Sequence, residues 1–243
     1  MGNITLTGTG VGSSPAIGTD DYGNPSTNNH VTAAHGNITV NADSLDLTSN
    51  GSSVNFSTPG TVTFALVTAV DSISVANGGP GSLSLTAALL NNVSAGNITV
   101  GSTSDRGLLS IRGYHWNSKV TFLNGFGTIR LNGVTSTAAN DGITIATLNG
   151  NFINTAGSGA LAPGAGGRWL IFSQNAAHDT LGGLHNDFTV YNCTYGSSCN
   201  IPSTGNGLIY SQPQGLSLNL LNESSLLMPY EKADDDSSDS SRI

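Results

Sequence analysis

The phrase Gly-Asn-Ile-Thr occurs three times in this chain of 243 residues, at Gly2-Asn3-Ile4-Thr5, Gly36-Asn37-Ile38-Thr39 and Gly96-Asn97-Ile98-Thr99. Each copy lies in a short β-branched segment, which Gly, Asn and Ser separate from the next. Alternating apolar and polar side chains are typical of half-buried strands, and Gly and Asn are turn residues. The repeated phrase indicates one strand-and-turn unit that is stacked many times, so that most residues build a scaffold.

The overall composition supports an ordered, nearly uncharged scaffold. Gly, Asn, Ser and Thr make up nearly half of the chain, whereas charged residues are 9%, against about 25% in an ordinary soluble domain. Disordered chains combine low hydrophobicity with high charge, but this chain is 37% hydrophobic. The composition therefore favours a folded protein over residues 1–222.

The distribution of charge excludes two classes of partner. Residues 1–105 contain six Asp and no Lys or Arg. Binding to nucleic acid or to anionic lipid requires clusters of basic residues, and the chain has none. No stretch of about 18 apolar residues occurs, so we expect no membrane-spanning helix.

The spacing of the strand candidates predicts the fold class. Between residues 38 and 143 they follow one another about every ten residues, which suits either a β-sandwich or the coils of a β-solenoid. The similarity between units, and the lack of a long polar-out alternation, favour the solenoid. We therefore predict an all-β protein with a right-handed parallel β-helix.

Changes in composition along the sequence predict three regions. Residues 1–165 form the β-helix repeats, with a loop insertion at about 8–35 that is either functional or a tolerated insertion. Residues 166–222 form a small β-rich carboxyl-terminal cap. Residues 223–243 are acidic and Ser-rich, which predicts a disordered tail.

Cys193 and Cys199 are the only cysteines, six positions apart. Structural metal sites need four ligands with spacings such as C-x2-C, and no His cluster completes such a set here. The pair therefore predicts a small disulfide loop in an exported protein, with two free thiols as the alternative.

One segment carries a resemblance to a known family. It comprises Gly166-Gly167-Arg168-Trp169-Leu170-Ile171-Phe172-Ser173, Leu181-Gly182-Gly183-Leu184, Phe188-Thr189-Val190-Tyr191 and Gly205-Asn206-Gly207-Leu208-Ile209-Tyr210-Ser211. At these residues the chain resembles the filamentous-haemagglutinin-like exoproteins, which are adhesins exported by two-partner secretion in Gram-negative bacteria. Their shafts are Gly/Asn-rich β-helices, and many end in a Gly-Arg-Trp-Leu strand, a Gly-Gly-Leu turn and a final aromatic strand.

The resemblance implies an adhesive role, secretion to the bacterial cell surface, and an outer-membrane secretion partner for a longer parent protein. The family's amino-terminal secretion domain has an Asn-Pro-Asn phrase, and the nearest string here is Gly23-Asn24-Pro25-Ser26. The chain thus matches the carboxyl-terminal part of such a shaft. Cys193 and Cys199 are similar in kind to a cysteine pair that helps to retain some of these adhesins on the cell, but they lie farther from the carboxyl end.

Catalytic chemistry finds little support in the sequence. Parallel β-helices also host polysaccharide lyases and hydrolases, which use clustered carboxylates with a base or Ca2+. Asp20 and Asp21 are the only adjacent acidic pair before the tail, and the first basic residue is Arg106. We therefore predict a non-enzymatic protein without cofactor or metal. A β-helical carbohydrate-active enzyme and a purely structural shaft remain alternatives.

Two sets of residues are candidates for contact with carbohydrate. Tyr114 and Trp116 form either a sugar-stacking platform or a packing cluster at a corner. Eight N-x-S/T sequons are candidate glycosylation sites, and their Asn side chains are alternatively turn and ladder residues. The sequon residues are Asn3, Asn37, Asn50, Asn55, Asn92, Asn97, Asn192 and Asn222. The expected partner is a host-cell surface receptor or glycan.

Overall fold

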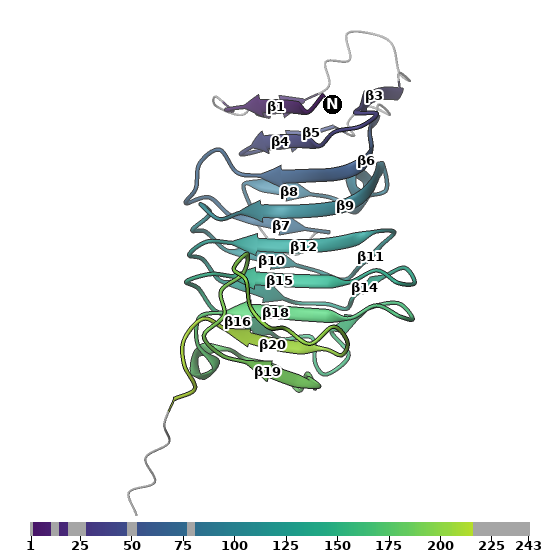
Figure 1. The fold of residues 1–243 in the computed structure, drawn as a ribbon. Helices are drawn as coiled ribbons and strands as arrows, with labels where there is room; N and C mark the ends of the chain where they lie inside the picture. Colours follow the sequence, from purple (N-terminus) through teal and green to yellow (C-terminus); the bar gives the residue numbers. More distant parts are fainter. Residues whose placement is uncertain (1, 11–14, 19–27, 48–52, 77–80, 216–243) are drawn as a thin grey trace, which may run out of the picture. The chain divides into compact units, whose positions relative to one another are not determined.

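The computed structural model describes residues 2–10, 15–18, 28–47, 53–76 and 81–215 (Figure 1). Residues 1–213 form one compact unit, which holds all of the described strands, and residues 214–243 form another. Several predictions concern residues outside the described ranges. They are the disordered tail at 223–243, much of the loop insertion at 8–35, the acidic pair Asp20 and Asp21, and the sequons at Asn50 and Asn222.

A long parallel sheet, the main sheet, runs through the first unit. Its pairing is parallel throughout, and successive strands lie side by side in Figure 1. In spatial order the strands are β1 (Ile4–Gly8), β4 (Ile38–Ala42), β6 (Ser53–Ala65), β9 (Val93–Ser102), β12 (Lys119–Asn124), β15 (Ile143–Thr147), β18 (Trp169–Ser173), β20 (Gly207–Tyr210) and β19 (Phe188–Val190), with β3 (Asn28–Thr32) also paired to β6. The predicted all-β class with stacked parallel strands is confirmed at this level.

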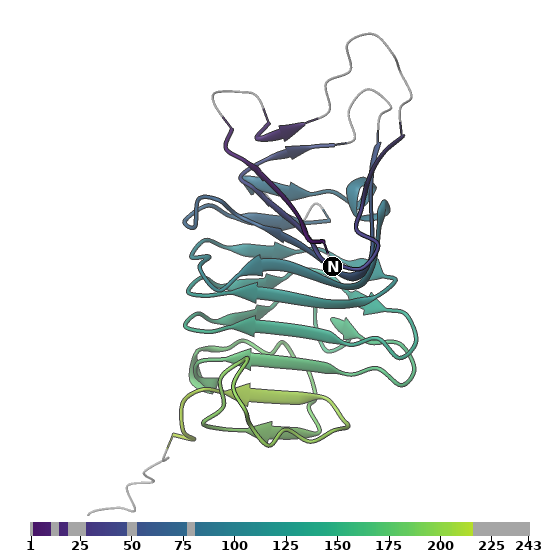
Figure 2. The ribbon, with the colours of Figure 1, turned by 45° about the horizontal axis from the view of Figure 1, so that its top comes forward.

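Three smaller parallel sheets are built from the segments between the main-sheet strands. Within each sheet the strands lie side by side and pair in parallel, and the view turned by 45° shows the same stacking (Figure 2). The second sheet has the order β16 (Phe152–Asn154), β13 (Ile129–Leu131), β10 (Leu109–Ile111), β7 (Ile73–Val75) and β8 (Leu83–Leu85). The third has β11 (Tyr114–Trp116), β14 (Thr135–Thr137) and β17 (Leu161–Ala162), and the fourth pairs β2 (Ile17–Gly18) with β5 (Leu45–Asp46).

The helical content is small. The helix α1 (Ala87–Leu90) directly follows β8, and the hydroxyl of its N-cap Thr86 accepts a hydrogen bond of 3.2 Å from the Leu89 N–H. A short 3-10 turn, η2 (Ala176–His178), follows β18. Sequence patterning suggested neither, because a single turn leaves no periodicity in the sequence.

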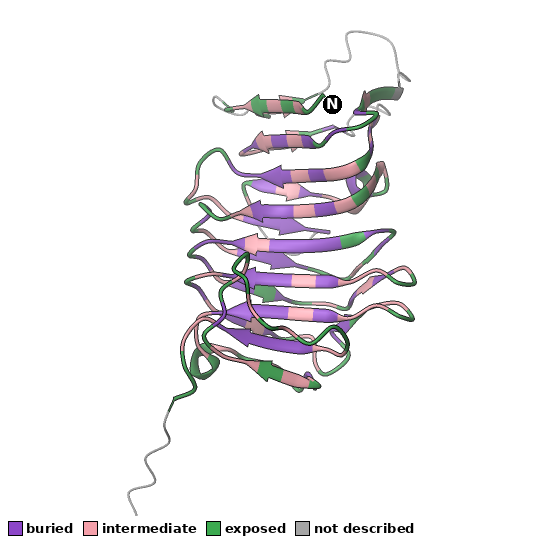
Figure 3. Cartoon of the chain, in the orientation of Figure 1, coloured by how far each residue is buried: buried purple, intermediate pink, exposed green. Residues whose placement is uncertain are grey.

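The main core lies between the sheets and is built from stacked equivalent positions. The register pairs Ile38 with Val62, Val62 with Ile98, and Ile98 with Val120, and all four side chains are buried. The intervening residues Thr39, Thr63 and Thr99 are only half-buried, because successive side chains of a strand point to opposite faces. Figure 3 shows this alternation along the strands.

The glycine of the repeated phrase allows adjacent passes of the chain to approach. A Cβ on Gly36 would lie 2.1 Å from the carbonyl oxygen of Gly2, and one on Gly96 would lie 2.3 Å from that of Pro59. Real Cβ atoms do not come so close to backbone oxygen. These positions therefore require glycine for steric reasons.

The asparagine of the phrase links one pass to the next. The Asn37 N–H donates to Asn3 Oδ1 at 2.9 Å, and the Thr61 N–H donates to Asn37 Oδ1 at 2.9 Å. Each amide oxygen thus satisfies a backbone donor of the following pass at a point where the strand ladder has not yet begun. Glycine permits close approach, asparagine bridges the passes, isoleucine fills the core and threonine faces outward.

The order of the last strands departs from the order of the chain. β20 lies between β18 and β19, and it pairs in parallel with both. The chain therefore passes from β18 to the end position of the sheet, forms β19 there, and returns to insert β20. Residues 169–210 thus continue the main sheet.

Candidate functional site

A second, smaller core lies on the opposite face of the main sheet. Ala146 and Phe172 directly follow the inward-facing Ile145 and Ile171, so their side chains point to the other face. The segment that joins β19 to β20 covers them. The buried members of this second core are Ala146, Phe172, Cys193 and Ile209, and the partly buried ones include Leu123, Leu170, Tyr195, Cys199 and Ile201.

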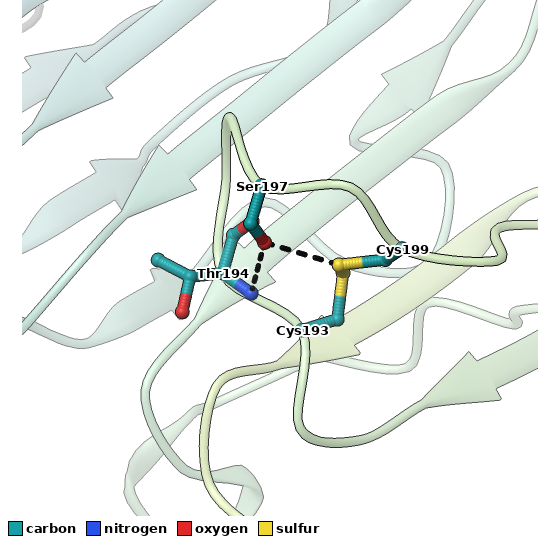
Figure 4. The surroundings of a disulfide bond; sticks show 4 residues. All are labelled: Cys193, Thr194, Ser197 and Cys199. Atoms are coloured by element: carbon teal, nitrogen blue, oxygen red, sulfur yellow. Dashed lines mark hydrogen bonds between the residues drawn. A yellow bond between two sulfur atoms is a disulfide. The ribbon is translucent and has the colours of Figure 1, made fainter.

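The predicted disulfide is present in this covering segment. Cys193 and Cys199 are bonded, with their Cα atoms 5.8 Å apart (Figure 4). Ser197 lies inside the loop, where its Oγ is 3.2 Å from the Thr194 nitrogen and 3.1 Å from Cys199 Sγ. The ring of Tyr195 packs edge-on against Phe172, with 5.2 Å between centroids. The bridge therefore closes a tight loop over the second core.

Polar contacts fix the covering segment to the main sheet. Arg168 Nη1 donates to the carbonyl oxygen of Pro202, and the Trp169 N–H donates to Asn206 Oδ1 at 3.0 Å. The Asn206 N–H in turn donates to Asp187 Oδ2 at 2.6 Å. Arg168 and Trp169 thus join the main sheet to the covering segment.

Removing the disulfide is expected to lower the free energy of unfolding by about 2 kcal/mol, because a short loop loses its constraint on the unfolded chain. The variant is Cys193→Ala with Cys199→Ala, and the measurement is a urea titration followed by circular dichroism. A reductant should shift the wild-type midpoint to that of the variant and leave the variant unchanged. Equal midpoints for oxidised wild type and variant would show that the bridge contributes nothing.

The structure corrects the prediction of a sugar-stacking platform at Trp116. Its side chain is 1% exposed and packs against Phe122 and Tyr114, with centroid distances of 5.6 and 4.9 Å. A sugar cannot reach a ring in this position, because the ring is part of the main core. Tyr114 is half-buried, and its hydroxyl donates to Asn91 Oδ1 at 2.8 Å. The packing alternative describes this pair.

The described sequon residues differ in exposure. Asn3, Asn37 and Asn192 are exposed, while Asn55, Asn92 and Asn97 are half-buried. Asn3 and Asn37 also serve as the ladder residues described above, and Asn92 Nδ2 donates to the carbonyl oxygen of Ala88 at 3.1 Å. Asn3 and Asn37 thus act as ladder residues that bridge adjacent passes. Glycosylation of the sequons stays a prediction.

Two buried or half-buried carboxylates serve the turns. Asp43 Oδ1 accepts from the N–H groups of Val67 and Thr68 at 3.0 and 2.7 Å. Asp105 is buried and accepts from the Ser102 hydroxyl at 2.6 Å; burial raises the pKa of Asp105, and its bonds to Ser102 oppose that effect. These carboxylates are occupied by backbone and hydroxyl donors of neighbouring turns.

Asp179 lies near the end of the main core. Its Oδ1 accepts from the Phe152 N–H at 2.8 Å, whereas its buried Oδ2 accepts no hydrogen bond of ordinary geometry from the described residues. Burial raises the pKa of Asp179, against the opposing effects of the Phe152 N–H, the Ser173 hydroxyl and His178. Burial, with smaller effects of Asp179 and Tyr191, raises the pKa of Tyr210 to about 12.

Asp179→Asn is expected to raise the melting temperature modestly at pH 7. A carboxyl whose folded pKa is raised favours folding when protonated, below its unfolded value near 3.8, and this contribution is lost as pH rises through the folded pKa. Asn retains an oxygen for the Phe152 N–H and carries no charge. Thermal melts from pH 4 to 7 should converge at the acidic end, and a constant difference across that range would contradict this explanation.

A hollow that sequence reasoning missed lies beside the repeated phrase. It has a volume of about 520 Å3 and is lined by Asn3, His35, Gly36, Asn37, Pro59 and Gly60. These residues are up to 57 positions apart in the sequence, so only the stacking brings them together. The repetition of Gly-Asn was the available signal, but it did not show that the stacked passes form a hollow.

Two further features are absent from the described part of the chain. Within those residues, no three His, Cys, Asp or Glu side chains are grouped as metal ligands. No helix in the same ranges is both long and apolar enough to cross a membrane. Comparison of the chain with protein-family models, with curated proteins and with solved structures found no match.

Proposed function

We propose that this chain is part of a non-enzymatic bacterial adhesin, and that its first unit is a right-handed parallel β-helix. The observation that carries the proposal is the parallel pairing of the main sheet from β1 to β19, accompanied by three smaller parallel sheets. Such stacking uses many residues to hold an extended outer surface. A surface of this kind suits contact with other cells.

The end of the stack supports the same proposal. Trp169 and Leu170 of the Gly-Arg-Trp-Leu segment begin β18, and both Gly182 and Gly183 adopt positive φ after it, at 59° and 85°. The aromatic strand is β20, which ends at Tyr210. These are the three elements on which the resemblance to filamentous-haemagglutinin-like exoproteins rests. The proposal includes the bacterial cell surface as the location and an outer-membrane secretion partner for the parent protein.

Saturable attachment to cells tests the proposal. The labelled chain is titrated onto epithelial cells and onto bacterial cells, and bound label is measured by flow cytometry with an excess of unlabelled chain as competitor. We expect binding that saturates and is competed. Absence of competed binding to every surface would favour a purely structural shaft, and release of sugars from acidic polysaccharides would favour an enzyme.

A further inference from the structure

The hollow beside the repeated phrase owes its shape to two glycines. A Cβ on Gly36 would lie 2.9 Å from Asn3 Oδ1, and one on Gly60 would lie 2.5 Å from Asn37 Oδ1. Each glycine therefore lets the asparagine side chain of the preceding pass lie across the next pass. Pro59 adds an exposed apolar ring surface to the lining.

The two asparagines are held in place with their donors unused. Asn3 Oδ1 and Asn37 Oδ1 each accept one backbone hydrogen bond of 2.9 Å, which fixes the side chains. Neither Nδ2 group has a hydrogen-bond partner within the described ranges. Fixed donors bind a ligand with little loss of side-chain entropy.

The column of these side chains continues along the stack. Asn37 is followed by Thr61 in the next pass, and Thr61 pairs with Asn97. Neighbouring strands lie about 4.8 Å apart, which is similar to the length of one pyranose residue in an extended β-linked polysaccharide. A chain of that kind that runs along the stacking direction would place one sugar at each pass.

A second outward column flanks the first, two residues farther along each strand. Thr5 pairs with Thr39, Thr39 with Thr63, and Thr63 with Thr99; Thr5 is exposed and the other three are half-buried. Their hydroxyl groups both donate and accept hydrogen bonds. The face therefore offers hydroxyl groups beside amide donors at the same repeat.

The charge of this region limits the class of ligand. Among the described residues, the hollow is lined by no Lys or Arg, so an anionic ligand would lack a counter-charge there. The first basic residue of the column is Lys119, which pairs with Asn97. The hollow is lined by no carboxylate, so a cation would lack its preferred oxygen ligands. Amide donors, a histidine and a proline ring together suit a neutral polyhydroxylated ligand.

We propose that the hollow and its asparagine column bind a neutral, extended β-linked polysaccharide, which lies along the stack with one sugar per pass. This inference rests on the proposed adhesive function and specifies the surface and the ligand class. The volume of about 520 Å3 falls within the range of about 300–1,000 Å3 that small-ligand sites occupy.

Isothermal titration with cellohexaose, a neutral β-1,4-linked hexasaccharide, tests the proposal on the full chain produced in a host without N-glycosylation. Asn37→Leu keeps the branched shape of the side chain but removes its donor and acceptor, and should raise Kd at least tenfold. The matched control is Asn200→Leu, an exposed residue that directly follows the disulfide loop, which should leave Kd unchanged. Maltohexaose, which is α-linked, and hexagalacturonate, which is acidic, should bind more weakly than cellohexaose.

A second variant guards against loss of the fold. Asn37→Asp retains an oxygen for the Thr61 N–H and removes the amide donor, so it should fold as the wild type does and bind cellohexaose with reduced affinity. Wild-type affinity in both folded variants would overturn the proposal. Saturable cell attachment without binding of cellohexaose would overturn this inference and leave the adhesive function standing, whereas loss of attachment as well would overturn both.

Discussion

Phe122→Ala is expected to lower the free energy of unfolding by about 3–5 kcal/mol, the usual cost of removing a buried phenyl ring. Phe122 has no exposed surface, and the register stacks it between Val100 and Ile145. Its ring also packs edge-on against Trp116, with 5.6 Å between centroids. Because each pass of the chain packs on the next, a cavity here disturbs both neighbours.

The matched control is Phe126→Ala, four residues away. Phe126 is 46% exposed, and the guanidinium carbon of Arg106 lies 4.2 Å from its ring centroid. Loss of that contact should cost about 0.5–1 kcal/mol. Urea denaturation followed by circular dichroism measures both variants, and similar costs for the two would show that the stacked core is not what stabilises the unit.

Gly127→Ala is expected to lower the free energy of unfolding by about 1–3 kcal/mol, the range for overpacking a close-packed site. A Cβ at this position would lie 2.0 Å from the carbonyl oxygen of Gly107 and 2.6 Å from that of Arg106. Both obstacles are backbone atoms, which cannot rotate away as a side chain can. The Gly127 N–H also donates to Asn124 Oδ1 at 2.7 Å, so a shift of the backbone would break a buried hydrogen bond.

Gly159→Ala is the control for this substitution. A Cβ there meets nothing within 4 Å, and its φ lies outside the left-handed region. Alanine should be neutral or raise stability by about 0.4–1 kcal/mol, because it restricts the unfolded chain. Thermal melts of the two variants side by side should separate them, and a Gly127 variant as stable as the wild type would refute the close approach of the passes.

Much of the scaffold could be predicted from local sequence signals. The Gly-Asn-Ile-Thr phrase carries the inward isoleucine, the outward threonine, the bridging asparagine and the close-approach glycine within four residues. The cysteine pair could be predicted as well, because its partners are near in sequence. These features are local, and repetition makes each one visible several times.

The features that the sequence did not predict depend on contacts between distant residues. Trp116 is an aromatic residue of the kind that stacks on sugars, but its burial against Phe122 makes it part of the main core. The second core joins Ala146 and Phe172 to Cys193 on the outer face of the sheet, and the sequence analysis did not predict it. The hollow likewise appears only when Asn3, Asn37 and Pro59 are stacked.

The position of β20 has a mechanical consequence. The last strand among the described residues is an interior strand of the sheet, with hydrogen-bonded ladders to β18 on one side and β19 on the other. A pulling force applied through the residues after Tyr210 would reach a strand held on both edges, and it would load the two ladders in parallel. The end of the stack should therefore resist peeling from that side.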